Sequence, residues 1–86
     1  MLFRSAQLRE AGDFGAAAAL YRVLTSKHPG EAGLWAMLGD ALRIAGDPIA
    51  GADALGKAAV LAPDDPDIAV EWALALREAG DAASRS

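Results

Sequence analysis

The chain is 86 residues long, which is enough for one domain with a modest hydrophobic core. Its net charge of −4 argues against a general binder of nucleic acids or anionic membranes, and its lack of cysteine excludes disulfides, thiolate nucleophiles and cysteine-ligated metals. Hydrophobic residues make up 53% of the chain, but alanine supplies much of that share and aromatic residues only 6%, so the composition favours closely packed helices over sheets.

Five helices are predicted, at about 2–11, 14–27, 33–45, 48–61 and 66–79. Prolines mark their limits: Pro29 and Pro63 follow the second and fourth helices, Pro48 opens the fourth, and Pro66 opens the fifth behind the capping residue Asp65. Every connection is short, so neighbouring helices are expected to run antiparallel. The second and fourth helices carry narrow alanine-rich faces, and a helix pair with so thin an apolar face needs a neighbouring pair to bury it.

A six-residue segment recurs three times at an interval of 34 positions. LREAGD stands at 8–13 and again at 76–81, and LRIAGD stands at 42–47. In each copy the glycine can end a helix in the left-handed conformation, and the aspartate can accept hydrogen bonds from the first free N–H groups of the next helix. Each AGD therefore predicts a corner between two helices, and the interval predicts an internal structural repeat.

The repeat unit carries a characteristic set of large and small residues. The middle unit, at 32–65, has them at Trp35, Leu38, Gly39, Leu42, Gly51, Leu55, Ala58 and Pro63. The first unit keeps Leu8, Ala17, Tyr21 and Pro29, and the third keeps Trp72, Ala73 and Leu76. This pattern resembles the tetratricopeptide repeat. The resemblance implies an all-α fold, a right-handed superhelix of antiparallel helix pairs, with repeat 1 at about 1–31, repeat 2 at about 32–65, a half repeat or capping helix at 66–80 and a flexible tail at 81–86.

The family has no catalytic centre, and the first helix of each pair lines a concave groove that binds peptides or partner proteins. The resemblance therefore implies a non-enzymatic scaffold for protein–protein interaction, without a cofactor, of the alanine- and glycine-rich kind found in bacteria. Its groove residues would be Arg9, Ala36, Asp40, Arg43, Ile44, Val70, Leu74 and Arg77. The alternative is a structural or oligomerising element, or an accessory segment of a larger protein, with no peptide ligand of its own.

Arginine occupies the same place in all three copies, as Arg9, Arg43 and Arg77. Packed helices lie about 8–10 Å apart and an extended peptide advances about 3.3 Å per residue, so the guanidinium groups could meet an acidic side chain at every third residue of a peptide. This interpretation predicts an acidic partner. A structural interpretation is preferred, because arginine in the last turn favours the helix dipole and nearby carboxylates, including Asp40 and Glu78, can neutralise it.

No other motif indicates a chemical site. His28 is the only histidine and stands in a predicted loop, and the acidic run at 64–67 lacks the spacing and glycine of a calcium-binding loop, so no metal is expected. Trp35 and Trp72 are expected in the core rather than on a ligand surface. No segment has the length of apolar sequence that crosses a bilayer, so the sequence predicts a soluble protein, in the cytoplasm unless the chain is part of a longer exported or membrane-anchored protein.

The last predicted helix is apolar on nearly every side, from Ile68 to Leu76. A terminal repeat that faces water should have a polar outer side. Either further repeats follow in the natural chain or the exposed side pairs with a second copy, and the second alternative predicts a symmetric homodimer through Ile68, Trp72 and Leu76.

Overall fold

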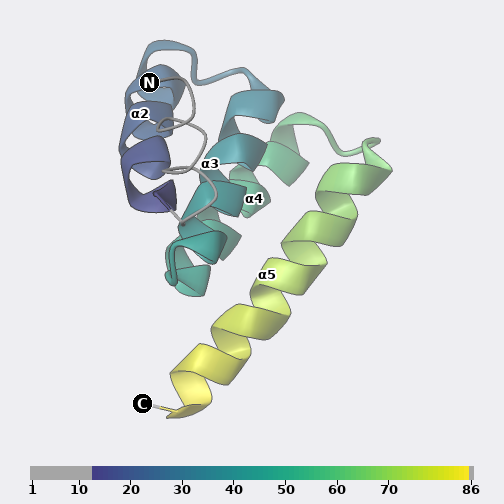
Figure 1. Ribbon diagram of the computed structural model, residues 1–86. Helices are drawn as coiled ribbons and strands as arrows, with labels where there is room; N and C mark the ends of the chain where they lie inside the picture. The colour runs from purple at the N-terminus through teal and green to yellow at the C-terminus, as the bar shows by residue number, and fades with distance from the viewer. Residues whose placement is uncertain (1–12, 86) are drawn as a thin grey trace, which may run out of the picture.

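The computed structural model describes residues 13–85, which form four α-helices and no strand (Figure 1). The helices are α2 (Phe14–Lys27), α3 (Ala32–Ile44), α4 (Pro48–Leu61) and α5 (Pro66–Arg85). The predicted all-α fold is confirmed for this part of the chain, and the first three of these helices begin and end within one residue of the predicted positions. The predicted helix at 2–11, with Arg9, lies outside the described residues.

Aspartates begin two of the helices, as the sequence predicts. The Asp47 carboxylate accepts a hydrogen bond from a backbone N–H in the first turn of α4 (3.2 Å). Asp65 accepts two at the start of α5, from the backbone N–H groups of Asp67 (3.0 Å) and Ile68 (3.3 Å). These bonds satisfy N–H groups that have no partner inside the helix. Asp13 precedes α2 without a bond of this kind.

The third AGD does not form the predicted corner, because α5 continues through it to Arg85. The tail predicted to be flexible at 81–86 is therefore helical as far as the structure describes it. The second AGD does form a corner, in which Gly46 has a φ of 101°, the only positive value among the described residues. The next residue explains the difference: Pro48 disfavours a helical backbone before it, whereas Ala82 continues a helix readily.

Helices α3 and α4 approach each other closely because two glycines face each other where the helices cross. A Cβ atom built on Gly39 would lie 2.9 Å from the Gly51 carbonyl oxygen, and one built on Gly51 would lie 2.9 Å from the Gly39 carbonyl oxygen. The two backbones therefore meet at this point with no side chain between them. A residue larger than glycine at either position would force the helices apart.

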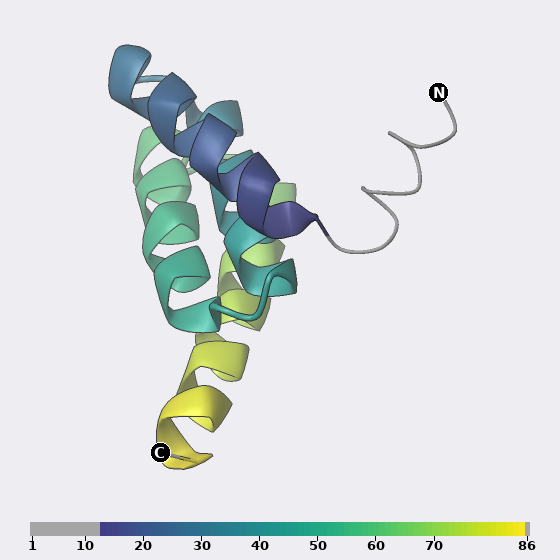
Figure 2. The ribbon, with the colours of Figure 1, turned by 60° about the vertical axis from the view of Figure 1, so that its left-hand side comes forward.

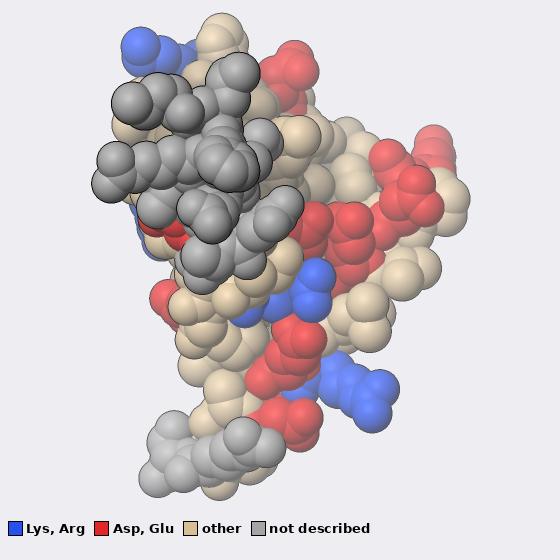
Figure 3. All heavy atoms as spheres, in the orientation of Figure 1, with Lys and Arg blue, Asp and Glu red and all other residues tan. Residues whose placement is uncertain are grey.

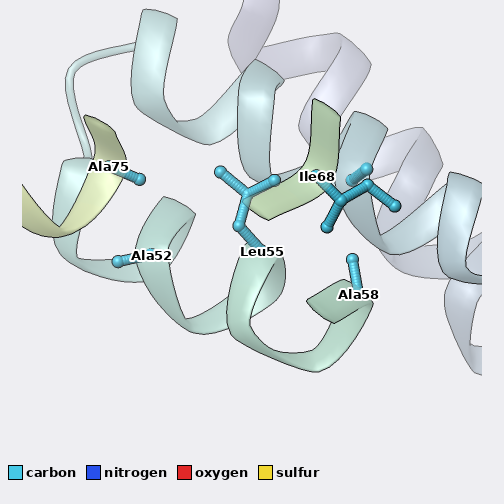
Figure 4. Packing of buried hydrophobic residues seen from close by; sticks show 6 residues of the cluster. Ala52, Leu55, Ala58, Ile68 and Ala75 are labelled. Atoms are coloured by element: carbon cyan, nitrogen blue, oxygen red, sulfur yellow. The ribbon is translucent and has the colours of Figure 1, made fainter. Parts of the chain in front are cut away.

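Two clusters of buried residues form the core. One joins α3, α4 and α5 around the fully buried Leu55, which lies among Ala52, Ala58, Ile68 and Ala75 (Figure 4). The other joins α2, α3 and α4, and its buried members are Ala18, Leu38, Ala41, Leu42 and Ala54. Because most of these side chains are alanine, the core depends on close helix packing more than on large apolar groups.

The 34-residue repeat is also present in the packing. Helix α3 packs on α2 and on α4, and α4 packs in turn on α5. Repeat-equivalent residues are buried in both the α2–α3 and the α4–α5 pair: Ala18 corresponds to Ala52, and Ala41 corresponds to Ala75. Two views agree that the C-terminal end of α5 projects beyond the other helices (Figures 1 and 2). This end of the helix is supported by little of the described chain.

Candidate partner-binding site

Most of the residues predicted to line a groove lie at the surface of α3 and α5. Those with partly or fully exposed side chains are Asp40, Arg43, Ile44, Val70, Leu74 and Arg77. Ala36 is not among them, because it is buried in the core cluster around Leu55. The side of α3 that carries Ala36 is covered by α4 and α5, which meet there. Ala36, of which 9% is exposed, therefore offers a ligand little surface.

An ion pair joins the two helices of this surface. The Arg43 guanidinium on α3 donates from Nη1 to Glu78 Oε2 on α5 (3.2 Å), and its Nη2 lies 3.6 Å from Asp40 Oδ1, one turn earlier on α3. The Arg43 side chain keeps 23% of its surface exposed, so this guanidinium is largely enclosed by its two carboxylates. Arg43 is thus paired within the chain, as the structural interpretation of the repeated arginine predicts.

Carboxylates outnumber cations around this ion pair. Burial, together with the nearby charges of Asp40, Asp67 and Asp65, raises the pKa of Glu71 above its ordinary value, while Arg43 opposes the shift. We call the surface formed by these groups the acidic face; it comprises Asp40, Arg43, Asp65, Asp67, Glu71 and Glu78. Figure 3 shows the red carboxylates gathered along α5 and its border with α3, with blue cations among them. Five carboxylates around one guanidinium give this face a negative potential.

Apolar side chains accompany the carboxylates. Met37 and Ile44 on α3 are 51% and 53% exposed, and Leu74 on α5 is 45% exposed. On α3, Met37, Asp40 and Ile44 are spaced so that they share one side of the helix. A hollow of about 360 Å³ begins beside them, between α3 and α2, and its lining includes Phe14, Ala17, Tyr21, Met37, Asp40 and Ile44. The site therefore offers apolar contact area next to fixed negative charge.

The two repeated arginines within the described part of the chain have different surroundings. Arg77 is exposed and makes no ion pair with a described residue, whereas Arg43 is held by Glu78 and Asp40. The excess of carboxylates over cations on the acidic face was not predicted from the sequence. A signal was present, since Asp67, Glu71 and Glu78 recur at helical spacing on one side of the last helix.

A second hollow, of about 620 Å³, lies between α4 and α5 on another part of the surface. Its lining includes Trp35, Gly56, Lys57, Val60, Leu61 and Trp72. The Trp35 indole N–H donates to the Pro29 carbonyl oxygen (2.8 Å), and the Lys57 ammonium lies 4.6 Å from the centre of the Trp35 ring. Both tryptophans also pack against the core, as predicted.

This packing buries some of the residues predicted for self-association and leaves others exposed. Ile68 is buried in the core and Trp72 is half-buried against it, whereas Leu76 is 50% exposed. Ile68, of which 7% is exposed, therefore offers a second copy little surface. The reason is that α4 covers the side of α5 on which Ile68, Ala75 and Ala79 lie.

The described residues contain no group of three or more acidic or histidine side chains arranged to hold a metal ion. None of the four described helices combines the length and the apolar character that a bilayer-spanning helix needs. Comparison of the chain with protein-family models, with curated proteins and with solved structures found no match.

Proposed function

We propose that the protein is a non-enzymatic scaffold of the tetratricopeptide type, which binds a segment of a partner protein along α3 and α5. The internal repeat, the helix pairs and the exposed side of α3 support this proposal. The observation that carries it is the acidic face itself, where Arg43 is enclosed by Glu78 and Asp40 while apolar side chains stand exposed beside them. A surface of this kind combines apolar area with charges that select the partner.

The charge of the face favours a basic partner segment over the acidic one suggested by the repeated arginines. An acidic peptide would have to displace Glu78 or Asp40 from Arg43 and would meet the remaining carboxylates as like charges. A peptide with lysine or arginine would instead be attracted to Glu71, Asp67 and Asp40. Leucine or similar residues between its cations would cover Met37, Ile44 and Leu74, which gives affinity that salt does not screen.

A titration with matched peptides tests this function. Two labelled peptides of equal length, one repeating Lys-Leu-Ser and one repeating Glu-Leu-Ser, are titrated with the protein while fluorescence anisotropy is recorded. We expect the lysine peptide to bind and its dissociation constant to rise with salt, because exposed charges are screened within about 10 Å at 0.1 M salt. Equal or tighter binding of the glutamate peptide would contradict the proposal.

Two charge reversals locate the binding. Glu71→Lys, within the acidic face, is expected to raise the dissociation constant of the lysine peptide about three- to tenfold. The variant replaces an attraction with a repulsion at a partly exposed site. Asp53→Lys changes the net charge equally but lies on α4, at the tryptophan-lined hollow, and serves as the control. Equal weakening by the two variants would mean that the peptide responds to net charge and not to this face.

The structural or oligomerising alternative also has an observation in its favour. The C-terminal end of α5 projects from the body, and the earlier part of this helix carries the exposed apolar side chains of Val70, Leu74 and Leu76. If neither peptide binds at concentrations up to about 1 mM, a limit that corresponds to roughly −4 kcal/mol, this alternative becomes the better account.

A further inference from the structure

One side of α5 is open, although the repeat-equivalent side of α3 is covered. A shift of 34 positions relates Gly39 to Ala73 and Leu42 to Leu76. Gly39 and Leu42 are buried, with Gly39 in contact with α4, whereas Ala73 is exposed and Leu76 is 50% exposed. The described chain thus supplies a helix against α3 and none at the corresponding place against α5.

The open side of α5 continues into the tryptophan-lined hollow. Val60 and Leu61, at the end of α4, are 78% and 43% exposed, and Trp72 of α5 lines the same hollow. One turn further along α5, Leu76 follows Trp72 on the same side of the helix. We call this continuous surface the α4–α5 surface; it comprises Val60, Leu61, Ala69, Trp72, Ala73 and Leu76.

A helix laid on the α4–α5 surface would stand to α5 as α4 stands to α3. The end of α5 also projects beyond the other described helices, so a neighbouring helix could lie along it (Figures 1 and 2). Both observations leave room for a further helix along α5. The identity of that helix follows from the spacing of the residues that it must contact.

We propose that the α4–α5 surface is covered by α5 of a second copy, in a symmetric antiparallel pair. The exposed residues Ala69, Ala73, Leu76 and Gly80 follow one another at intervals of four, three and four, the spacing of a helix-pair seam. If the two-fold axis passes between Ala73 and Leu76, each Leu76 faces Ala73 of the second copy and each Ala69 faces its Gly80. Each large Leu76 then meets a small Ala73, and the small Ala69 and Gly80 let the helices approach closely, so the surface is complementary to itself.

The charge pattern agrees with this pairing. All four seam positions are uncharged, so pairing them buries no carboxylate or cation. The carboxylates of the acidic face, including Glu71 and Glu78, lie on a different side of α5 and remain in water. The dimer and the proposed peptide site therefore use separate surfaces, and either can exist without the other.

The pair is expected to be weak. Eleven residue steps from Ala69 to Gly80 correspond to about 16 Å of helix, and a contact of that length with the end of α4 falls near or below the roughly 1,200 Å² of a small specific interface. We therefore expect a dissociation constant of roughly 10–500 μM. The protein would be a monomer in dilute solution and a dimer in concentrated solution.

Sedimentation velocity between about 5 μM and 1 mM tests the proposal. We expect a reversible shift from monomer to dimer, and we expect Leu76→Glu to abolish it because the dimer would hold two carboxylates in an apolar seam. Ile49→Glu, at a residue that is 54% exposed in the first turn of α4, is the matched control and should dimerise like the parent protein. Circular dichroism shows whether each variant keeps its helices.

Cysteine pairing tests the register, since the chain has no cysteine of its own. The single variants Ala73→Cys and Leu76→Cys are oxidised separately and as an equimolar mixture. The proposed register predicts more disulfide-linked dimer in the mixture than in either variant alone, because these two positions face each other. A monomer at every concentration, a dimer that persists in Leu76→Glu, or equal cross-linking in all three samples would each overturn the proposal.

Discussion

Replacement of Gly39 by alanine tests the closest contact in the fold. The added Cβ would lie 2.5 Å from Leu55 Cγ and 2.9 Å from the Gly51 carbonyl oxygen, whereas non-bonded carbon atoms normally stay about 3.5–4.0 Å apart. Neither neighbour can withdraw easily, because Leu55 is fully buried and the oxygen belongs to the backbone of α4. Helices α3 and α4 must therefore separate, which disturbs the core around Leu55.

Two opposing effects set the change in the free energy of unfolding that Gly39→Ala causes. Alanine is favoured over glycine inside a helix by about 0.8–1.0 kcal/mol, which would stabilise the variant. Overpacking a close-packed core typically costs about 1–3 kcal/mol, and two neighbours that cannot easily move place Gly39→Ala in the upper half of that range, at about 2–3 kcal/mol. We expect a net loss of about 1–2 kcal/mol in the free energy of unfolding. For a domain of this size, that corresponds to a thermal midpoint lower by roughly 5–15 °C.

The assay is thermal and urea unfolding followed by circular dichroism at 222 nm. Gly33→Ala is the matched control, since Gly33 lies in the same helix and has no atom within 4 Å of the position of an added Cβ. This control should keep or raise the midpoint. If Gly39→Ala unfolds at or above the midpoint of the parent protein, the helices do not meet through these glycines and the close crossing of α3 and α4 is refuted.

Four further changes follow from the same structure. Leu55→Ala should lower the free energy of unfolding by about 2.7–5 kcal/mol, because it empties a fully buried site; a loss below about 1 kcal/mol in urea unfolding would contradict this core. Asp47→Ala should cost about 0.5–2 kcal/mol through the lost cap of α4, and Asp13→Ala clearly less, because Asp13 makes no such bond; equal losses would argue against the capping geometry. Gly80→Ala should raise the thermal midpoint, since Gly80 is helical with open space around it, whereas a turn at this position would make the variant less stable. The raised pKa of Glu71 means that the folded state holds the proton of this carboxyl more tightly than the unfolded chain does. The contribution of Glu71 to the free energy of unfolding therefore falls as the pH rises above roughly 4.3. Glu71→Gln should raise the thermal midpoint at pH 7 and leave it unchanged at pH 3, which scanning calorimetry can measure.

The positions of the helices were predicted well where capping residues, glycine or proline mark the helix ends in the sequence. Asp65 followed by Pro66 marks the start of α5, and Gly46 followed by Asp47 and Pro48 marks the corner before α4. The third AGD misled the prediction because glycine and aspartate permit a corner without requiring one. The proline that follows the second copy has no counterpart after the third, and a helix continues by default through alanine-rich sequence.

The candidate site was harder to predict because it depends on how the helices turn about their axes. Ala36 shares a side of α3 with Asp40, yet it is buried because α4 and α5 meet over it. Arg43 was expected to be neutralised by nearby carboxylates such as Asp40 and Glu78, and it pairs with both, although Glu78 is 35 residues away. Distances of this kind follow from tertiary packing and not from local spacing. The carboxylates near Glu71 could have been noticed in part, because Asp67, Glu71 and Glu78 recur at helical spacing in the sequence.

The Arg43–Glu78 ion pair joins α5 to α3, and Glu78 belongs to the acidic face along which we propose that a basic partner binds. A partner lysine that paired with Glu78 would weaken this link between the helices, and the Arg43 guanidinium would keep only its pairing with Asp40. Binding at the acidic face and the orientation of α5 are therefore thermodynamically linked. Anything that fixes one orientation of α5 must change the affinity for the partner by the same factor by which the partner changes the equilibrium between orientations.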